Sequence, residues 1–200
     1  MATRAYHHGA LRATLITRAT DHIAREGVET LSIRALAKEA GVAHRAAYQH
    51  FPDKDGLIAA VFVEAYARLD ARIEKTVAAS VEDRLMQVAR ALAAFADEEP
   101  NMFLAMTGPR INRSGAHEAL EKAIAKSWRH VAGPIGDGVD SGLFGTPDKR
   151  AAAALFWGGF TGVVTQAALG RLKVKPSERA RFFEDAAARL MAGLRAAGAP

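Results

Sequence analysis

The stretch SIRALAKEAGVAHRAAYQHF, from Ser32 to Phe51, decides the fold of this chain. Apolar residues recur at helical spacing over residues 33–40, directly after a serine, which is a favoured residue at helix N-termini. Gly41 follows, and glycine adopts the left-handed conformation that turns a chain sharply out of a helix. A second short helix is expected from about Ala43. Two helices joined by a short glycine-containing turn predict a helix-turn-helix, whose second helix enters the DNA major groove.

The residues in and after the second helix indicate which kind of helix-turn-helix protein this is. The segment AGVA at residues 40–43 is followed by Tyr48, by the pair His50-Phe51, and by Lys54 and Leu57. This order resembles the helix-turn-helix of the TetR family of transcriptional regulators over roughly residues 10–70. The resemblance implies a DNA-binding domain at residues 10–70, with the motif itself at 32–51, and a C-terminal effector-binding and dimerisation domain at 78–197. No alternating β pattern occurs, so the sequence predicts an all-α fold of about nine helices.

The composition favours a globular protein with a nucleic-acid partner and argues against secreted and membrane proteins. The 200 residues are half hydrophobic and include no cysteine, which excludes disulfides and thiolate metal sites. The net charge is +5, and the first 50 residues carry seven basic and four acidic side chains, which fits a nucleic-acid partner. Neither a secretory signal nor a clean membrane span is apparent. The most apolar stretch, residues 151–169, is expected to be a buried or subunit-interface helix. The protein is therefore expected to be cytoplasmic, without a membrane partner.

Local signals predict several boundaries. Residues 1–9 are expected to form a flexible arm ahead of a helix from about Ala10 to Glu26. Gly133-Pro134 predicts a kink or break within a helix over residues 116–141. Thr146-Pro147 provides a cap followed by proline at the first helical position, so the next helix is expected to start there.

The DNA contacts are expected on the second helix of the motif and beside it. Arg45 is the candidate guanine reader, because its guanidinium matches guanine O6 and N7, while Gln49 is a candidate for adenine or phosphate. Tyr48 and Lys54 resemble the family residues that meet the DNA backbone. The sequence departs from the family at Ala43, where a capping Ser or Thr is usual, and at Arg45, where a small residue is common. The candidate DNA contacts are Ser32, Arg34, His44, Arg45, Ala46, Tyr48, Gln49, His50 and Lys54.

The remainder of the chain resembles the effector domain of such regulators. A set of large apolar residues is a candidate lining for an effector cavity, and the alternative is that they simply form the core. The family resemblance implies repression that is relieved by an unknown small, largely apolar effector. The candidate cavity residues are Phe95, Met102, Phe103, Met106, Trp128 and Phe160.

Two consecutive helices with large apolar faces at the C-terminus predict a homodimer interface. A homodimer would present two copies of the second motif helix to a near-palindromic site on double-stranded DNA. Thr161 stands where a related C-terminal signature, Trp-x3-His-Gly, has histidine. The candidate interface residues are Phe156, Trp157, Thr161, Phe183 and Leu190.

Enzymatic function is not expected, because the chain lacks the usual nucleophile, phosphate-loop and metalloprotease motifs. We likewise expect no cofactor and no metal site. The alternative to a DNA-binding regulator is a helical ligand-binding or structural dimer that no longer reads a specific DNA site. Ala43 and Arg45 are the residues that keep this alternative open.

Overall fold

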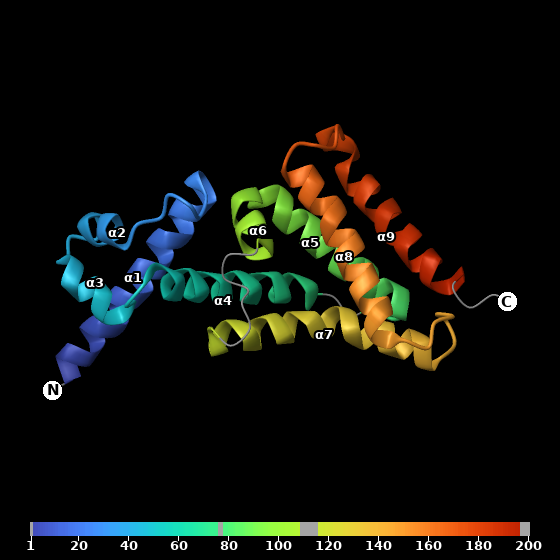
Figure 1. Cartoon of the computed structure of the whole chain (residues 1–200), viewed down its shortest axis with the longest axis horizontal. Coiled ribbons are helices and arrows are strands. Elements are labelled where there is room, and N and C mark those ends of the chain that lie inside the picture. The colour runs from blue at the N-terminus through green and yellow to red at the C-terminus, as the bar shows by residue number, and fades with distance from the viewer. Residues whose placement is uncertain (1, 76–77, 109–115, 197–200) are drawn as a thin grey trace. The chain divides into compact units, whose positions relative to one another are not determined.

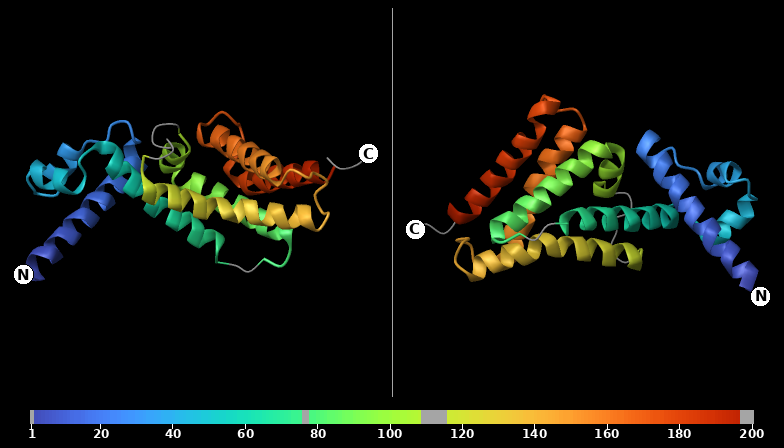
Figure 2. Two further views of the ribbon diagram at one scale, coloured as in Figure 1. Left: turned by 60° about the horizontal axis from the view of Figure 1, so that its bottom comes forward. Right: turned by 180° about the vertical axis from the view of Figure 1, so that it is seen from behind.

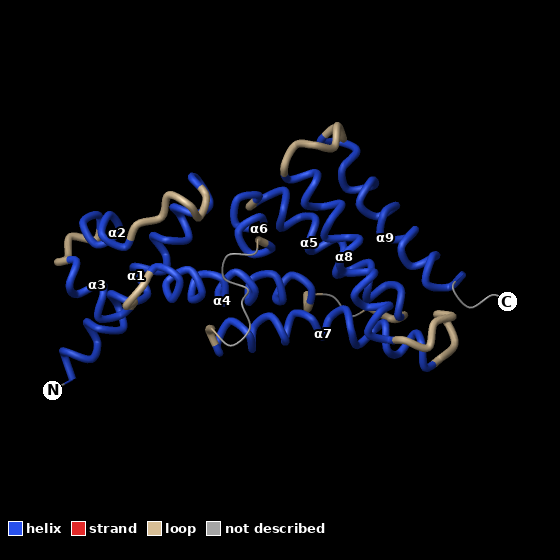
Figure 3. The backbone as a smooth tube through the Cα atoms, in the orientation of Figure 1, coloured by secondary structure: helices blue, strands red, loops and turns tan. Residues whose placement is uncertain are grey.

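The computed structural model describes the backbone of residues 2–75, 78–108 and 116–196, and the side chains of residues 10–75, 78–108 and 116–195. These residues form nine α-helices and one short 3-10 helix, with no strand among them (Figure 3), which confirms the predicted all-α class. The helices are α1 (Ala2–Glu26), α2 (Ile33–Glu39), α3 (His44–His50), α4 (Lys54–Ile73), α5 (Val81–Glu98), α6 (Pro100–Thr107), α7 (Glu118–Asp140), α8 (Lys149–Ala168), the 3-10 helix η1 (Pro176–Glu178) and α9 (Arg179–Ala196).

Two of the predicted boundaries are wrong. Helix α1 begins at Ala2, so residues 2–9 belong to a helix and not to a flexible arm. Helix α8 begins at Lys149 and not at Pro147, because Asp148 provides the cap: its Oδ1 accepts a hydrogen bond from the Ala151 N–H at 2.9 Å. An aspartate is a strong N-cap, so it fixes the start of α8 two residues later than the Thr-Pro pair predicts.

Helix α7 runs without a break from Glu118 to Asp140, with Pro134 inside it (Figure 2). Proline lacks the N–H that would bond to the carbonyl of His130, but its fixed φ is close to the helical value. The lost hydrogen bond therefore leaves one carbonyl of α7 without its helical partner and does not end the helix.

The chain divides into two compact units. The first consists of Met1–Ala67 with Glu99–Ala123, and the second of Arg68–Glu98 with Ile124–Pro200. Helices α4 and α7 each contribute residues to both units. The predicted domains at 10–70 and 78–197 stay a prediction, and this division places α6 with the N-terminal helices.

In the first unit, α1 packs against α2, α3 and α6 (Figure 1). The apolar face of α1 lies in the core of this unit, since Leu15 and Ile23 are fully buried. Phe51 is 3% exposed and lies in the core of this unit, and the guanidinium of Arg12 lies 5.3 Å from its ring centre. The Asn101 side chain donates to the carbonyl of Ala24 at 2.9 Å and ties α6 to the end of α1.

In the second unit, α5 packs against α8 and α9, and α8 packs against α9 (Figures 1 and 2). Aromatic rings fill the space between these helices. Phe156 and Phe160 stack with 6.3 Å between ring centres, and Phe160 meets Phe183 edge-on at 6.4 Å. Burial of such rings stabilises this unit.

Candidate nucleic-acid interface

The turn between α2 and α3 is built from local hydrogen bonds. Ser32 caps α2, and its Oγ accepts from the Ala35 N–H at 3.4 Å. After α2, Gly41 takes a φ of +70°, which only glycine adopts without strain. The Val42 N–H then donates to the Ala37 carbonyl at 3.0 Å and closes the turn. The predicted helix-turn-helix geometry is therefore present.

Helix α3 is short and starts without a side-chain cap. Ala43 precedes it in an extended conformation and offers no hydrogen bond to the first turn. The absent cap costs α3 about 1 kcal/mol compared with a serine or threonine at this position. The helix is held instead by Ala47, which is fully buried, and by the buried Phe51 that follows it.

The opposite side of α3 faces solvent. Tyr48 is 43% exposed, a large fraction for an aromatic side chain, and the ring of His44 meets its ring edge-on with 6.5 Å between centres. Arg45 makes no hydrogen bond or ion pair with any residue that the structure describes. The exposed side chains of α3 are His44, Arg45, Tyr48 and Gln49.

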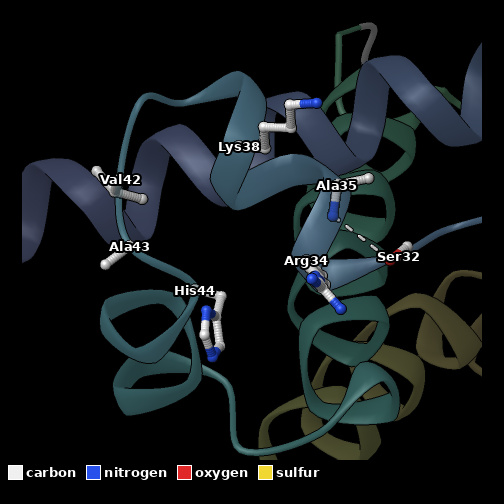
Figure 4. A pocket seen from close by; sticks show the side chains of 7 residues that line it. All are labelled: Ser32, Arg34, Ala35, Lys38, Val42, Ala43 and His44. Atoms are coloured by element: carbon white, nitrogen blue, oxygen red, sulfur yellow. Dashed lines mark hydrogen bonds between the residues drawn. The ribbon is translucent and has the colours of Figure 1, made fainter.

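A groove of about 540 Å³ lies between α2 and the start of α3 (Figure 4). Arg34 and His44 point into the space between the two helices. Ser32, Val42 and Ala43 contribute to its walls. The groove combines a basic rim with small side chains beneath it, which suits a phosphate backbone that approaches α3.

Lys38 also lines this groove and was not among the predicted contacts. It lies four residues after Arg34, and residues at this spacing share one helix face. Both side chains are exposed, and neither has an ionic partner in the described part of the chain. The spacing of two basic residues on α2 was the sequence signal that points to Lys38.

The remaining predicted contacts are less exposed. Ala46 and His50 are half-buried. Lys54 is half-buried too, and its ammonium group donates to the backbone carbonyl of Glu29 at 2.8 Å. The structure therefore gives Lys54 a partner within the protein, at the junction of α4 with the loop before α2.

The candidate cavity residues of the C-terminal part are mostly buried. Five of them are at most 3% exposed, and Trp128 alone is half-buried, with its ring edge-on to Trp157 at 6.4 Å between centres. None of the six lines the groove between α2 and α3 or the pocket beside Ile73, Val88 and Pro134. Burial agrees equally with a packed core, so their role in effector binding stays a prediction.

The candidate interface residues differ in exposure. Phe156 and Phe183 are buried in the core of the second unit, at 1% and 3% exposed. Trp157, Thr161 and Leu190 are half-buried. The large apolar side chains that do face solvent on α8 are Leu155, 60% exposed, and Leu169, 43% exposed and immediately after the helix.

Helix α8 is also the one described helix that is long and apolar enough to cross a membrane, with a third of its most apolar window buried. A subunit interface accounts for an apolar face of this kind as readily as a lipid contact does. Within the described residues, no group of three or more His, Cys, Asp or Glu side chains is arranged to hold a metal ion.

Comparison with known proteins agrees with this architecture. Residues 15–61 match a model of bacterial regulatory proteins of the tetR family, and residues 85–190 match a tetracyclin repressor-like C-terminal domain. The HTH-type transcriptional regulator Rv1816 of Mycobacterium tuberculosis is 27% identical over 121 residues, which are 58% of this chain and 50% of that protein. The chain thus spans about half the length of the curated relatives it matches.

Solved structures resemble the chain over most of its length. A protein of unknown function from Rhodococcus sp. RHA1 is 30% identical with a TM-score of 0.79, covering 95% of this chain and 98% of that one. The transcriptional regulator FadR from Bacillus subtilis, in complex with stearoyl-CoA, is 20% identical with a TM-score of 0.70, covering 90% of this chain and 98% of that one. The second likeness shows the fold alone.

Proposed function

This chain belongs to the TetR family of bacterial regulatory proteins, and from that premise we propose that it is a homodimeric, sequence-specific DNA-binding regulator of transcription. We propose further that it represses its targets until a small, largely apolar effector binds the C-terminal part. The family consists of regulators and is in general not enzymatic, and the same is proposed here, together with a cytoplasmic location.

The observation that carries the DNA-binding proposal is the exposed face of α3. Arg45, Tyr48 and Gln49 project away from the buried Ala47, so a major groove can receive them. Arg45 has no partner among the described residues, which leaves its guanidinium available to a guanine edge. Arg34 and Lys38 beside the groove supply phosphate contacts, which position the helix without reading sequence.

The dimer proposal rests on the uncovered side of α8. Leu155 faces solvent. Gly158 and Gly162 lie one and two turns further, and a β-carbon placed on either would meet no neighbouring atom within 4 Å. Small residues at this spacing let a second helix approach closely, and the exposed leucine then becomes buried. Because Phe156 and Phe183 lie in the core, Leu155 and Leu169 take their place as proposed contacts, beside Trp157, Thr161 and Leu190.

Two α3 helices related by a two-fold axis would enter successive major grooves about 34–36 Å apart. The dimer can have conformations that differ in the distance between its two α3 helices. An effector that binds one conformation more tightly increases its population and so changes the affinity for DNA. Helix α4 starts at Lys54, three residues after the motif, and runs to Ile73 in the second unit. It is the proposed mechanical link between effector and DNA.

The experiment is selection of duplexes from a random pool by the full-length protein at near-physiological salt. We expect enrichment of one near-palindromic site with half-sites about one helical turn apart. Binding that is weak, indifferent to sequence and lost as salt rises would overturn the proposal and favour a dimer that no longer reads DNA. The missing cap at Ala43, at the start of α3, would account for this second outcome.

A further inference from the structure

A second pocket lies in the C-terminal unit, between the last turn of α4, the first half of α5 and the middle of α7. Its volume is about 350 Å³, at the lower end of the range for small-molecule sites. The apolar part of its lining consists of Ile73, Val88 and Pro134, which are all buried. Its charged side chains are Glu74, directly after α4, Arg84 on α5, and Arg129 on α7, with the imidazole of His130 beside them.

Most of these charged side chains already have ionic partners. Arg84 pairs with Asp137 at 2.8 Å between Nη2 and Oδ2. Glu74 pairs with Lys126 at 3.2 Å between Oε1 and Nζ. The neighbouring carboxylates of Glu74 and Asp70 raise the pKa of Lys126, so its ammonium group is fully charged at neutral pH.

His130 lies where α7 meets α4. Its Nε2 is 3.5 Å from Glu74 Oε1 and 3.6 Å from Asp70 Oδ1. The Asp70 side chain is only 2% exposed, and its Oδ1 and the Nε2 of His130 are both buried without a hydrogen bond in the described part of the chain. The acidic pair at the end of α4 thus has the ammonium group of Lys126 at 3.4 Å from Asp70 and 3.2 Å from Glu74, with the imidazole of His130 beside it.

Arg129 is the exception in this lining. It is exposed at the pocket rim and makes no ion pair or hydrogen bond with any described residue. A guanidinium holds a carboxylate by two parallel hydrogen bonds, a geometry that a single ammonium does not offer. The pocket therefore combines one unengaged cation with a buried apolar wall.

We propose that this pocket binds a small organic monocarboxylate, with the carboxylate on Arg129 and the apolar body against Ile73, Val88 and Pro134. The carboxylates of Asp70 and Glu74 repel a bound carboxylate, but the ammonium group of Lys126 lies 3.4 Å and 3.2 Å from them and offsets their charge. The proposal deepens the effector proposal above by naming the class of effector, and its regulatory meaning rests on that proposed function.

The site also suits a role in regulation. Asp70 and Ile73 belong to the last turn of α4 and Glu74 follows it directly, while Lys126, Arg129 and His130 belong to α7. Arg129 and His130 both line the pocket, so a carboxylate bound to Arg129 lies close to the contacts of His130 with Asp70 and Glu74. Binding that favours one arrangement of these contacts changes the position of α4, whose other end follows the DNA-binding motif.

The test is calorimetric titration of the full-length protein with hexanoate, octanoate and benzoate, each compared with its uncharged primary amide. Wild type is expected to bind at least one acid ten-fold or more tightly than the matching amide. Arg129→Gln is expected to lose that difference, while Arg150→Gln, at an exposed arginine in the first turn of α8, is expected to keep it. Circular dichroism confirms that each variant is folded.

Equal binding of acids and amides, unchanged binding by Arg129→Gln, or no binding at all would each overturn the proposal. DNA binding is measured on the same preparations without acid. Failure of the carboxylate proposal can therefore be told apart from failure of the DNA-binding proposal. Acid binding with no selected DNA site would overturn the regulator and leave the carboxylate pocket standing. A selected site whose occupancy the bound acid leaves unchanged would remove the effector role from this pocket.

Discussion

The ammonium group of Lys54 donates a hydrogen bond to the backbone carbonyl of Glu29, with 2.8 Å between Nζ and O. The bond joins the first residue of α4 to the loop that precedes α2, across 25 positions of sequence. It anchors the α2–α3 motif against the helix that leaves it. A residue that resembles a family phosphate contact therefore also has a structural role.

Lys54→Met is expected to lower the free energy of unfolding by about 1 kcal/mol, because it leaves the Glu29 carbonyl without this donor. Lys38→Met is the matched control, since Lys38 has no such partner among the described residues and is expected to keep wild-type stability. Urea denaturation measures both. Equal stability of the Lys54 variant and wild type would contradict the structural role.

The same pair of variants separates stability from DNA contact. Lys38→Met removes a proposed phosphate contact, so the slope of log affinity against log salt is expected to become shallower by about 0.9. The measurement is a salt titration of binding to the selected duplex. An unchanged slope would remove Lys38 from the interface.

The sequence predicted the helix ends well wherever glycine marks them. A positive φ is a local requirement that one residue type satisfies, so it can be predicted without tertiary information. Gly41, which the sequence predicts to end a helix, has a positive φ, as do Gly27, Gly142 and Gly170 after α1, α7 and α8, whereas Gly108 after α6 has a φ of −72°.

Gly138 on α7 is required for close packing and not for a positive φ. A β-carbon at this position would lie 2.4 Å from two ring atoms of Phe144, which is 2% exposed. Gly138→Ala is therefore expected to destabilise the protein by about 1–3 kcal/mol through overpacking. Gly136→Ala, on the same helix, meets only the flexible Lys149 side chain at 3.9 Å and is expected to gain about 0.5–1 kcal/mol. Thermal denaturation that ranks the two variants in the reverse order would contradict this packing.

Stability at acid pH is expected to depend on Glu98. The two hydrogen bonds from the Arg72 guanidinium hold the pKa of Glu98 below its ordinary value of 4.5. A depressed pKa in the folded state means that the stabilisation is complete above pH 4.5 and is lost as the pH falls through the lower folded-state value. Glu98 is 57% exposed, so the pair contributes less than about 1 kcal/mol.

Glu98→Gln is therefore expected to be slightly less stable than wild type at pH 7, with the difference shrinking at pH 4 and below. Urea denaturation at pH 7, 5 and 4 measures this difference. A gap that stays constant over that range would show that the Glu98 charge does not contribute to it.

Leu155→Glu is expected to convert the proposed dimer to monomer, because it places a charge on the exposed apolar face of α8. Leu155→Met retains an apolar side chain of similar volume and is expected to remain dimeric. Sedimentation equilibrium measures the assembly state. A dimeric Leu155→Glu protein would move the interface away from this face.

Other features of the site required the three-dimensional structure. Apolar character predicted that Phe156 and Phe183 are buried, but it does not tell whether the chain or a partner buries them. The contact of Glu74 with His130 joins residues more than 50 positions apart, so no local pattern reports it. The helical state of residues 2–9 was missed because that segment lacks an apolar stripe.

The exposed face of α3 is the centre of this account, and Arg45 tests it most directly. On the selected duplex, we compare the base preferences of wild type, Arg45→Ala and Arg25→Ala, an exposed arginine in the last turn of α1. Arg45→Ala is expected to lose about 1–3 kcal/mol of discrimination at one symmetric pair of positions, while Arg25→Ala keeps it. Base preferences that Arg45→Ala leaves unchanged at every position would contradict the assignment of α3 as the helix that reads DNA.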